Sequence, residues 1–142
     1  MSQETIIEVR DLCNQFGTQV VHQHLDFDLY RGEILGVVGG SGTGKSVLLR
    51  SIVGLRQPNA GTVRVFGEEL LSLPAERRSQ LERRFGVLYQ RGALFSSLTV
   101  SENIALPLIE HAGLSRAAAE RLARVKIALA GLPQDAADKY PS

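Results

Sequence analysis

Short runs of alternating apolar and polar residues occur in the first part of the chain, separated by turn formers. Residues 5–9 and 20–29 are two such runs, and in the second leucine and phenylalanine alternate with aspartate. This alternation is typical of strands with one buried face. Residues 62–66 alternate in the same way after a turn at residues 58–61. The three runs predict a largely antiparallel sheet.

Other runs in this part of the chain are apolar throughout. Residues 34–38 and 85–89 are short and rich in branched side chains, as buried parallel strands are. Residues 47–53 are too apolar for a loop and stop at Gly54, so they predict a helix. The fold class that follows is α/β, in which a parallel core carries the antiparallel layer.

Helix signals dominate the remainder of the chain. Thr99 and Glu102 fit a capping box, so a helix is expected to begin there and to be bent or ended by Pro107. Ser115 is expected to cap a second helix that stops at Gly131. Its apolar stripe is predicted to face the core. That stripe consists of Ala118, Leu122, Val125 and Leu129.

Two charged or polar segments have no such stripe. Residues 70–84 are expected to be helical in part, and their four arginines favour a solvated helix face over a site for phosphate or lipid headgroups. Residues 133–142 are polar and predicted to be a loop.

Composition narrows the functional classes. The chain has 142 residues and a net charge of +1 with both signs interspersed, so nothing points to a nucleic-acid partner. Cys13 is the single cysteine, which excludes an internal disulfide and fits a reducing cytoplasm. The sequence shows no signal peptide and no apolar run long enough to span a bilayer. The three histidines show no metal-ligand spacing with a cysteine or carboxylate cluster, so surface or strand positions are expected for them.

One octet carries chemistry of its own. It fits the phosphate-loop pattern G-x-x-x-x-G-K-[ST] and stands between an expected strand and an expected helix. The octet is Gly39, Gly40, Ser41, Gly42, Thr43, Gly44, Lys45 and Ser46. Glycine lets such a loop turn its N–H groups around an oxyanion, where a Cβ would clash. In this pattern the lysine reaches the β- and γ-phosphates, and the hydroxyl after it ligates Mg²⁺. The octet predicts a nucleoside triphosphate as ligand.

The segments around the octet follow a particular order. Phe16 lies upstream, turn residues 58–63 follow the expected helix, and Gln90 ends the apolar run at residues 85–89. In this order the chain resembles the nucleotide-binding subunit of ABC transporters, from Ile7 to its last residue. The resemblance implies that Phe16 stacks on adenine and that Gln90 approaches Mg²⁺ and the attacking water.

The resemblance also implies the ligands and the site. ATP and Mg²⁺ are the implied cofactors, with catalytic roles for Lys45 and Gln90 and with Ser46 and Gln90 near the metal. The implied nucleotide contacts are Phe16, the eight residues of the octet and Val47. The implied fold is an ABC-type P-loop NTPase core with an antiparallel β subdomain and the start of a helical subdomain. On this basis residues 1–142 form one incomplete domain, divided near residue 90 into a β subdomain with the phosphate-loop core (1–90) and a helical part (91–142).

A narrower likeness lies in residues 92–100 and 102–108. These segments look like those of the ATPases of Mla-type transporters, which move phospholipid between bacterial membranes with an MCE-type substrate-binding protein. The implied partners are a transmembrane permease, a second copy of the ATPase subunit and an MCE-type protein. The implied location is cytoplasmic, peripheral on the inner face of the cell membrane. Residues 91–108 would form the docking surface for the permease, and the alternative for their apolar side chains is ordinary packing inside the helical subdomain.

Several motifs of the complete family are not in these 142 residues. The signature segment, the Walker B carboxylates and the switch histidine are missing, and Tyr140-Pro141-Ser142 looks like the approach to the signature. The expectation is a truncated chain that binds nucleotide weakly, does not turn it over, and leaves residues 34–38 as an unpaired apolar edge. A non-catalytic nucleotide-binding module and a P-loop small-molecule kinase are the alternatives. Soluble ABC proteins that act on DNA or ribosomes usually carry long insertions, and none is found here.

Overall fold

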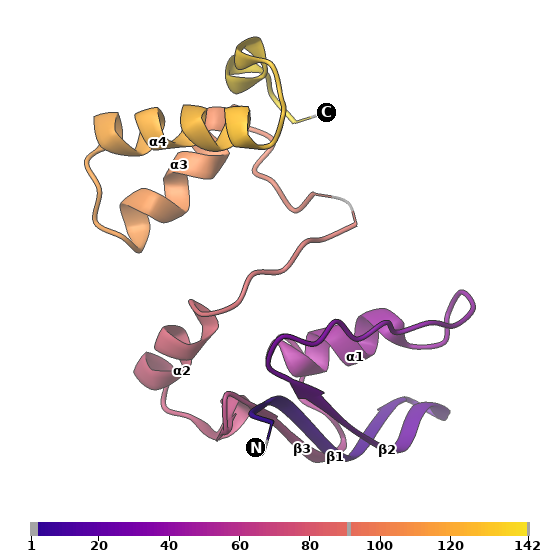
Figure 1. The fold of residues 1–142 in the computed structure, drawn as a ribbon. Helices are drawn as coiled ribbons and strands as arrows, with labels where there is room; N and C mark the ends of the chain where they lie inside the picture. Colours follow the sequence, from indigo (N-terminus) through magenta and orange to yellow (C-terminus); the bar gives the residue numbers. More distant parts are fainter. Residues whose placement is uncertain (1–2, 91, 142) are drawn as a thin grey trace. The chain divides into compact units, whose positions relative to one another are not determined.

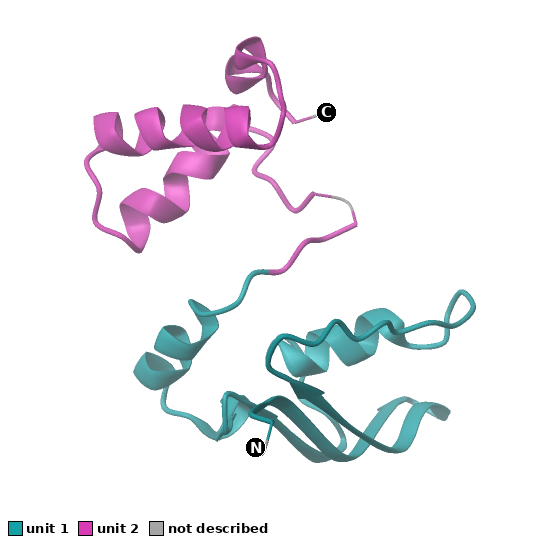
Figure 2. Cartoon of the chain, viewed as in Figure 1, with its two compact units in different colours: residues 1–86 teal, residues 87–142 magenta. Residues whose placement is uncertain are grey.

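The computed structural model describes residues 3–90 and 92–141. The chain folds as two compact units, residues 1–86 and residues 87–142 (Figure 2). The first unit contains a sheet and two α-helices, and the second is helical.

The sheet of the first unit is antiparallel and has the strand order β2-β1-β3-β4 (Figure 1). Its strands are β1 (Thr5–Phe16), β2 (Gln19–Tyr30), β3 (Ala60–Val65) and β4 (Glu68–Glu69). The three strands predicted from alternation are therefore confirmed. β1 continues further than expected, as far as Phe16, because a two-residue turn with Gly17 at φ +57° returns the chain directly into β2.

Helix α1 (Lys45–Ile52) covers one face of this sheet. Leu48 of the helix packs in one buried cluster with four strand side chains, and Ile52 packs against its edge. The strand members of the cluster are Val9, Leu12, Val63 and Val65. The predicted helix is confirmed, and Gly54 follows it in the left-handed conformation at φ +76°.

The prediction of two parallel strands is wrong. Residues 34–38 and 85–89 belong to no strand, and the side chains of Ile34, Val38 and Leu88 are 98%, 92% and 95% exposed. A strand of a parallel sheet needs at least one hydrogen-bonded neighbour. Within residues 3–90 and 92–141 no strand pairs with either segment. Of the second run only Phe85 packs against the core cluster of the sheet.

The arginine-rich segment is helical in part, as predicted. A 3₁₀ turn (η1, Leu70–Ser72) precedes helix α2 (Ala75–Glu82). Arg77 forms an ion pair with Glu68 at 2.6 Å, and Arg78 pairs with Glu82 one turn along the helix at 2.8 Å. These ion pairs fit the solvated helix face and leave no reason to read the cluster as a phosphate site.

The second unit is built on α3 (Val100–Glu110) and α4 (Arg116–Leu129). The capping box is confirmed: the Glu102 N–H donates to Thr99 Oγ1 at 3.2 Å, and the Thr99 N–H donates to Glu102 Oε2 at 2.9 Å. Ser115 caps α4 as expected. α3 is not ended by Pro107 but continues to Glu110.

The segment predicted to be a loop at the end of the chain contains a 3₁₀ helix, η2 (Gln134–Asp138). Its Ala137 is buried, and the Lys139 carbonyl accepts a hydrogen bond from the Val100 N–H at 2.8 Å. A single buried alanine among polar residues carries no periodic signal, so the sequence did not reveal this turn. None of the helices in the described parts of the chain is long and apolar enough to cross a bilayer.

The predicted core stripe of α4 is also wrong. Val125 and Leu129 are 53% and 81% exposed, and the buried face is a different one. That face consists of Ala119, Ala123 and Ile127, and its alanines pack with Ala105 of α3. Small side chains allow two helices to approach closely, so the face with alanines rather than the larger residues is the one that packs.

This packing predicts a contrast between two substitutions in α4. Ala123→Leu is expected to destabilise the second unit by about 1–3 kcal/mol, because extra methylene groups do not fit a closely packed helix pair. Leu129→Ala is expected to change the unfolding free energy by less than about 0.5 kcal/mol, because that side chain is exposed. Urea unfolding followed by circular dichroism measures both. Equal effects of the two substitutions would contradict the packing described.

Candidate functional site

The phosphate-loop octet curls around the side chain of its own lysine. The Lys45 Nζ donates to the carbonyl oxygens of Gly39 and Gly40 at 2.7 Å and 2.5 Å. Thr43 Oγ1 donates to the Gly40 carbonyl at 2.9 Å, which closes the loop across its base. The loop backbone therefore surrounds a fixed positive charge.

Glycine is required at two positions of this loop. A Cβ on Gly44, at φ +92°, would lie 2.3 Å from Val21 Cγ1 and 2.7 Å from His22 Nε2. A Cβ on Gly39 would lie 2.8 Å from Thr43 Oγ1. At Gly44 the obstacle comes from β2, so the loop is pressed onto the sheet where the helix begins.

Helix α1 begins directly behind the loop. Gly44 is its N-cap, and the first intrahelical bond runs from the Leu48 N–H to the Gly44 carbonyl at 2.9 Å. The N–H groups of Lys45, Ser46 and Val47 precede that bond, and helix geometry gives them no intrahelical acceptor. Such groups, together with the positive end of the helix dipole, bind anions. The Lys45 ammonium and the free N–H groups of this first turn together provide positive charge that is complementary to a chain of phosphate groups.

The first turn also fits a magnesium ion. The Ser46 side chain is exposed beside the lysine, and a hydroxyl oxygen is a ligand that Mg²⁺ accepts together with phosphate oxygens. The residues present therefore fit the ion that the phosphate-loop pattern implies, with Ser46 as the holder from this unit.

Phe16 lies at the end of β1, and one face of its ring is covered. The guanidinium carbon of Arg56 lies 4.0 Å from the ring centroid, within the range of a cation–π contact. The Phe16 side chain is still 45% exposed. A flat apolar surface is therefore available in the same unit as the phosphate loop.

A buried polar network lies beneath the helix, and sequence reasoning missed it. Asn14 of β1 is fully buried, and its Nδ2 donates to Ser51 Oγ at 3.1 Å and to His22 Nδ1 at 3.2 Å. Ser51 Oγ in turn donates to the Val47 carbonyl at 3.1 Å. Partial burial lowers the pKa of the His22 imidazole, so the neutral ring can accept at Nδ1. The sequence signal that could have revealed this network is the position of Asn14, two residues after Leu12. In a strand this spacing places both side chains on the same, buried face.

Gln90 is the predicted site residue that belongs to the other unit. It is exposed at a turn and belongs to residues 87–142, whereas Phe16 and the loop belong to residues 1–86. Its contact with Mg²⁺ and water therefore stays a prediction. Arg91, the first residue of the expected docking segment, lies outside the described residues.

Three potential metal-ligand residues meet on the sheet, which the sequence spacing did not indicate. The ligand atoms of Asp11, Cys13 and His24 lie within 4.8 Å of one another. Irregular pairing between β1 and β2 brings them together, with Asp11 and His24 both at positive φ. His24 contacts the Asp11 carboxylate directly, and both side chains are more than 60% exposed. The pair is a surface contact, and the phosphate site makes no use of it.

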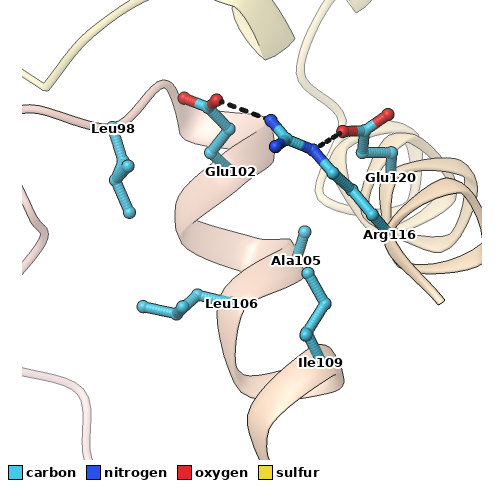
Figure 3. A pocket seen from close by; sticks show the side chains of 7 residues that line it. All are labelled: Leu98, Glu102, Ala105, Leu106, Ile109, Arg116 and Glu120. Atoms are coloured by element: carbon cyan, nitrogen blue, oxygen red, sulfur yellow. Dashed lines mark hydrogen bonds and ion pairs between the residues drawn. The ribbon is translucent and has the colours of Figure 1, made fainter. Parts of the chain in front are cut away.

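A pocket opens between α3 and α4 in the second unit (Figure 3). Arg116 spans its upper edge, with ion-pair distances of 3.5 Å to Glu102 and 2.9 Å to Glu120. The remaining lining is apolar and comes from Leu98, Ala105, Leu106 and Ile109. An apolar hollow with a charged edge suits an apolar segment of a partner better than a phosphate group.

The loop, its lysine and the helix behind it define the class of phosphate-loop nucleotide-binding proteins. The family model described as ABC transporter matches residues 22–141, so the chain belongs to the ABC transporter family.

Curated relatives agree with this family. The chain is 39% identical over 139 residues to the methionine import ATP-binding protein MetN of Brucella abortus (strain 2308), covering 96% of the chain and 37% of that protein. It is 36% identical over 135 residues to the probable ribonucleotide transport ATP-binding protein mkl of Mycobacterium leprae (strain TN), covering 95% of the chain and 39% of that protein. The chain therefore spans well under half the length of these relatives.

Solved structures confirm the fold. A dimeric ATP-binding cassette in a post-hydrolysis state with ADP and Pi superposes with a TM-score of 0.84 at 24% identity, covering 96% of this chain and 62% of that one. An ATP-binding subunit of an ABC transporter gives a TM-score of 0.74 at 29% identity, covering 96% and 55%. The predicted α/β P-loop class, with its antiparallel β layer, is thus confirmed.

Proposed function

We propose that this chain is the nucleotide-binding part of an ABC transporter ATPase, in which it binds ATP with Mg²⁺. The observation that carries the proposal is Lys45 Nζ, held at the centre of the loop by the carbonyls of Gly39 and Gly40. Phosphate oxygens would replace these carbonyls as partners of the ammonium. The free N–H groups at the start of α1 would complete the cradle.

Different residues of the chain contact different parts of the nucleotide. Phe16 stacks on the adenine, residues 39–47 surround the phosphates, and Lys45 neutralises charge that develops on the transferring phosphoryl group. Ser46 holds the metal, which when bound supplies further charge neutralisation at the phosphates. Gln90 senses the γ-phosphate and positions water. Catalysis of this kind depends on positioning and electrostatics more than on covalent chemistry.

The partners follow from the family and from the second unit. In the complete transporter two ATPase subunits would enclose two ATP molecules, and a transmembrane permease would dock on residues 91–108. Leu94 and Phe95 support this docking, because their side chains are 51% and 60% exposed. The apolar pocket of Figure 3 is lined in part by that segment, through Leu98 and Leu106, and would extend the contact surface onto α4. The protein would then be cytoplasmic and peripheral to the membrane.

The prediction of the transported substrate is supported by fewer observations than the prediction of ATP binding. The phospholipid expectation depends on the likeness of residues 92–108 to Mla-type ATPases, and neither the phospholipid nor an MCE-type partner is supported by the relatives. Their names give methionine and ribonucleotides instead. Transport of labelled phospholipid, methionine and ribonucleotide by the reconstituted complete transporter separates the three substrates.

A binding experiment tests the function of the chain. Titration calorimetry with ATP and Mg²⁺ is expected to show saturable binding, whereas AMP, which lacks the β- and γ-phosphates that Lys45 reaches, is expected to bind at least about tenfold more weakly. Equal affinity for AMP and ATP would contradict a site built around the phosphate loop.

A second experiment concerns turnover. We expect no phosphate release from ATP and Mg²⁺ by the 142 residues, because the sequence contains none of the carboxylates that position the attacking water in this family. Phosphate release that disappears in the Lys45→Ala variant would overturn this expectation. Release that persists in that variant would come from a contaminating phosphatase.

A further inference from the structure

The Arg56 guanidinium group makes three contacts: two hydrogen bonds and one cation–π contact with an aromatic ring. Its Nε donates to Asn14 Oδ1 at 3.2 Å, and its Nη2 donates to the Gln15 carbonyl at 3.1 Å. The guanidinium carbon lies 4.0 Å from the centroid of Phe16. Three consecutive residues of β1 thus fix one guanidinium group.

The support for Arg56 is rigid because Asn14 cannot move. The Asn14 amide is fully buried and also bonds to Ser51 of α1 and to His22 of β2. Buried polar groups with all their partners present define a single arrangement. Through Asn14, the arginine next to the ring is linked to the helix that carries the phosphate loop.

The placement has a chemical consequence for the ring. A guanidinium group on one face withdraws electron density from an aromatic ring, since cations bind the negative face of its quadrupole. The exposed part of the Phe16 ring then presents an electron-poor surface. Purines are electron-rich and stack on such a surface better than on an unpolarised phenyl ring.

We propose that Arg56 strengthens binding of the nucleotide base through the Phe16 ring, and that Asn14 is the positioning residue that holds Arg56. The proposal rests on the proposed ATP-binding function and concerns the base end of that site. Arg56 acts through Phe16, so it contributes to binding of ATP and contributes nothing to binding of inorganic tripolyphosphate.

The experiment compares two ligands and uses the whole chain. ATP and inorganic tripolyphosphate, each with Mg²⁺, are titrated against the unmodified chain and against Arg56→Gln. Glutamine retains an amide donor for the strand but loses the cation. ATP affinity is expected to fall about three- to tenfold, with tripolyphosphate affinity unchanged within about twofold. Arg64→Gln, an exposed arginine on β3, is the matched control and is expected to change neither affinity.

A double-mutant cycle tests the role of Asn14. Asn14→Ala is expected to weaken ATP binding in the unmodified chain and to have little further effect in the Arg56→Gln background, because both changes remove one interaction. Arg56→Lys keeps the charge and is expected to recover part of the ATP affinity. Thermal melts of every variant verify that the first unit is folded.

The outcomes separate this proposal from the proposed function. If the unmodified chain binds ATP and Arg56→Gln binds it equally well, the role of Arg56 is wrong and the ATP site stands. If Arg56→Gln loses both ligands to the same extent, Arg56 acts on the phosphates or on folding, and the proposal is also overturned. If the unmodified chain binds neither ligand, both the proposed function and this inference are wrong.

Discussion

Replacing Lys45 with alanine is expected to reduce the affinity for ATP by at least about 100-fold. The Lys45 ammonium is the fixed charge at the centre of the loop, and it would make charge-assisted hydrogen bonds to two phosphate groups. Each hydrogen bond to a charged group is worth about 1.5–3 kcal/mol, and 1.4 kcal/mol corresponds to a factor of ten in affinity. Titration with ATP and Mg²⁺ measures the loss directly.

The control for this variant is another lysine of the chain. Lys126 lies on α4 in the second unit, so Lys126→Ala is expected to leave the ATP affinity unchanged. Because Lys45 also bonds to two loop carbonyls, a thermal melt of Lys45→Ala establishes that the first unit is still folded. A folded Lys45→Ala variant with unchanged ATP affinity would show that nucleotide binds elsewhere.

Local sequence patterns predicted the elements that depend on local interactions. The alternation in residues 20–29, the capping box of Thr99 and the glycine after α1 each involve neighbours within a few residues, and all three are confirmed. The hydrogen bonds within the phosphate-loop octet are local in the same way, because its residues are neighbours in the sequence, and its binding of phosphate stays a prediction.

The predictions that were wrong depend on partners distant in the sequence. Residues 34–38 have the composition of a buried strand, but a strand needs a paired neighbour, and composition does not supply one. Helix α3 packs closely against α4. This close packing favours a face with Ala119 and Ala123 over the face with the larger residues of the predicted stripe. The link between Asn14 and Ser51 joins residues 37 positions apart and leaves no periodic trace.

The same limit applies to the candidate site. Phe16 and the loop are both found in the first unit, but the cation next to the ring comes from Arg56, beyond the end of α1. No motif of the phosphate loop includes that residue. Its contribution becomes visible only when the strand and the segment after the helix are seen together.

Gly61→Ala is expected to destabilise the first unit by about 2–5 kcal/mol. Gly61 is at φ +88° in β3, where an L side chain costs about 1–2 kcal/mol. The added Cβ would also lie 2.3 Å from the Asp11 carbonyl oxygen and 2.6 Å from that of Arg10. These are backbone atoms of β1, so they can move only by opening the ladder between β1 and β3, and overpacking of this kind costs a further 1–3 kcal/mol or so.

Gly67→Ala separates the conformational penalty of a side chain at positive φ from the steric clash. Gly67 has a similar backbone conformation, φ +80°, but a Cβ there would meet no atom within 4 Å. It carries the conformational penalty alone, about 1–2 kcal/mol. Because 1 kcal/mol shifts the melting temperature of a domain of this size by about 4–8 °C, Gly61→Ala is expected to melt at least about 5 °C below Gly67→Ala. Equal melting temperatures would mean that β1 and β3 do not approach each other at Gly61, and the bulged pairing between them would then be wrong.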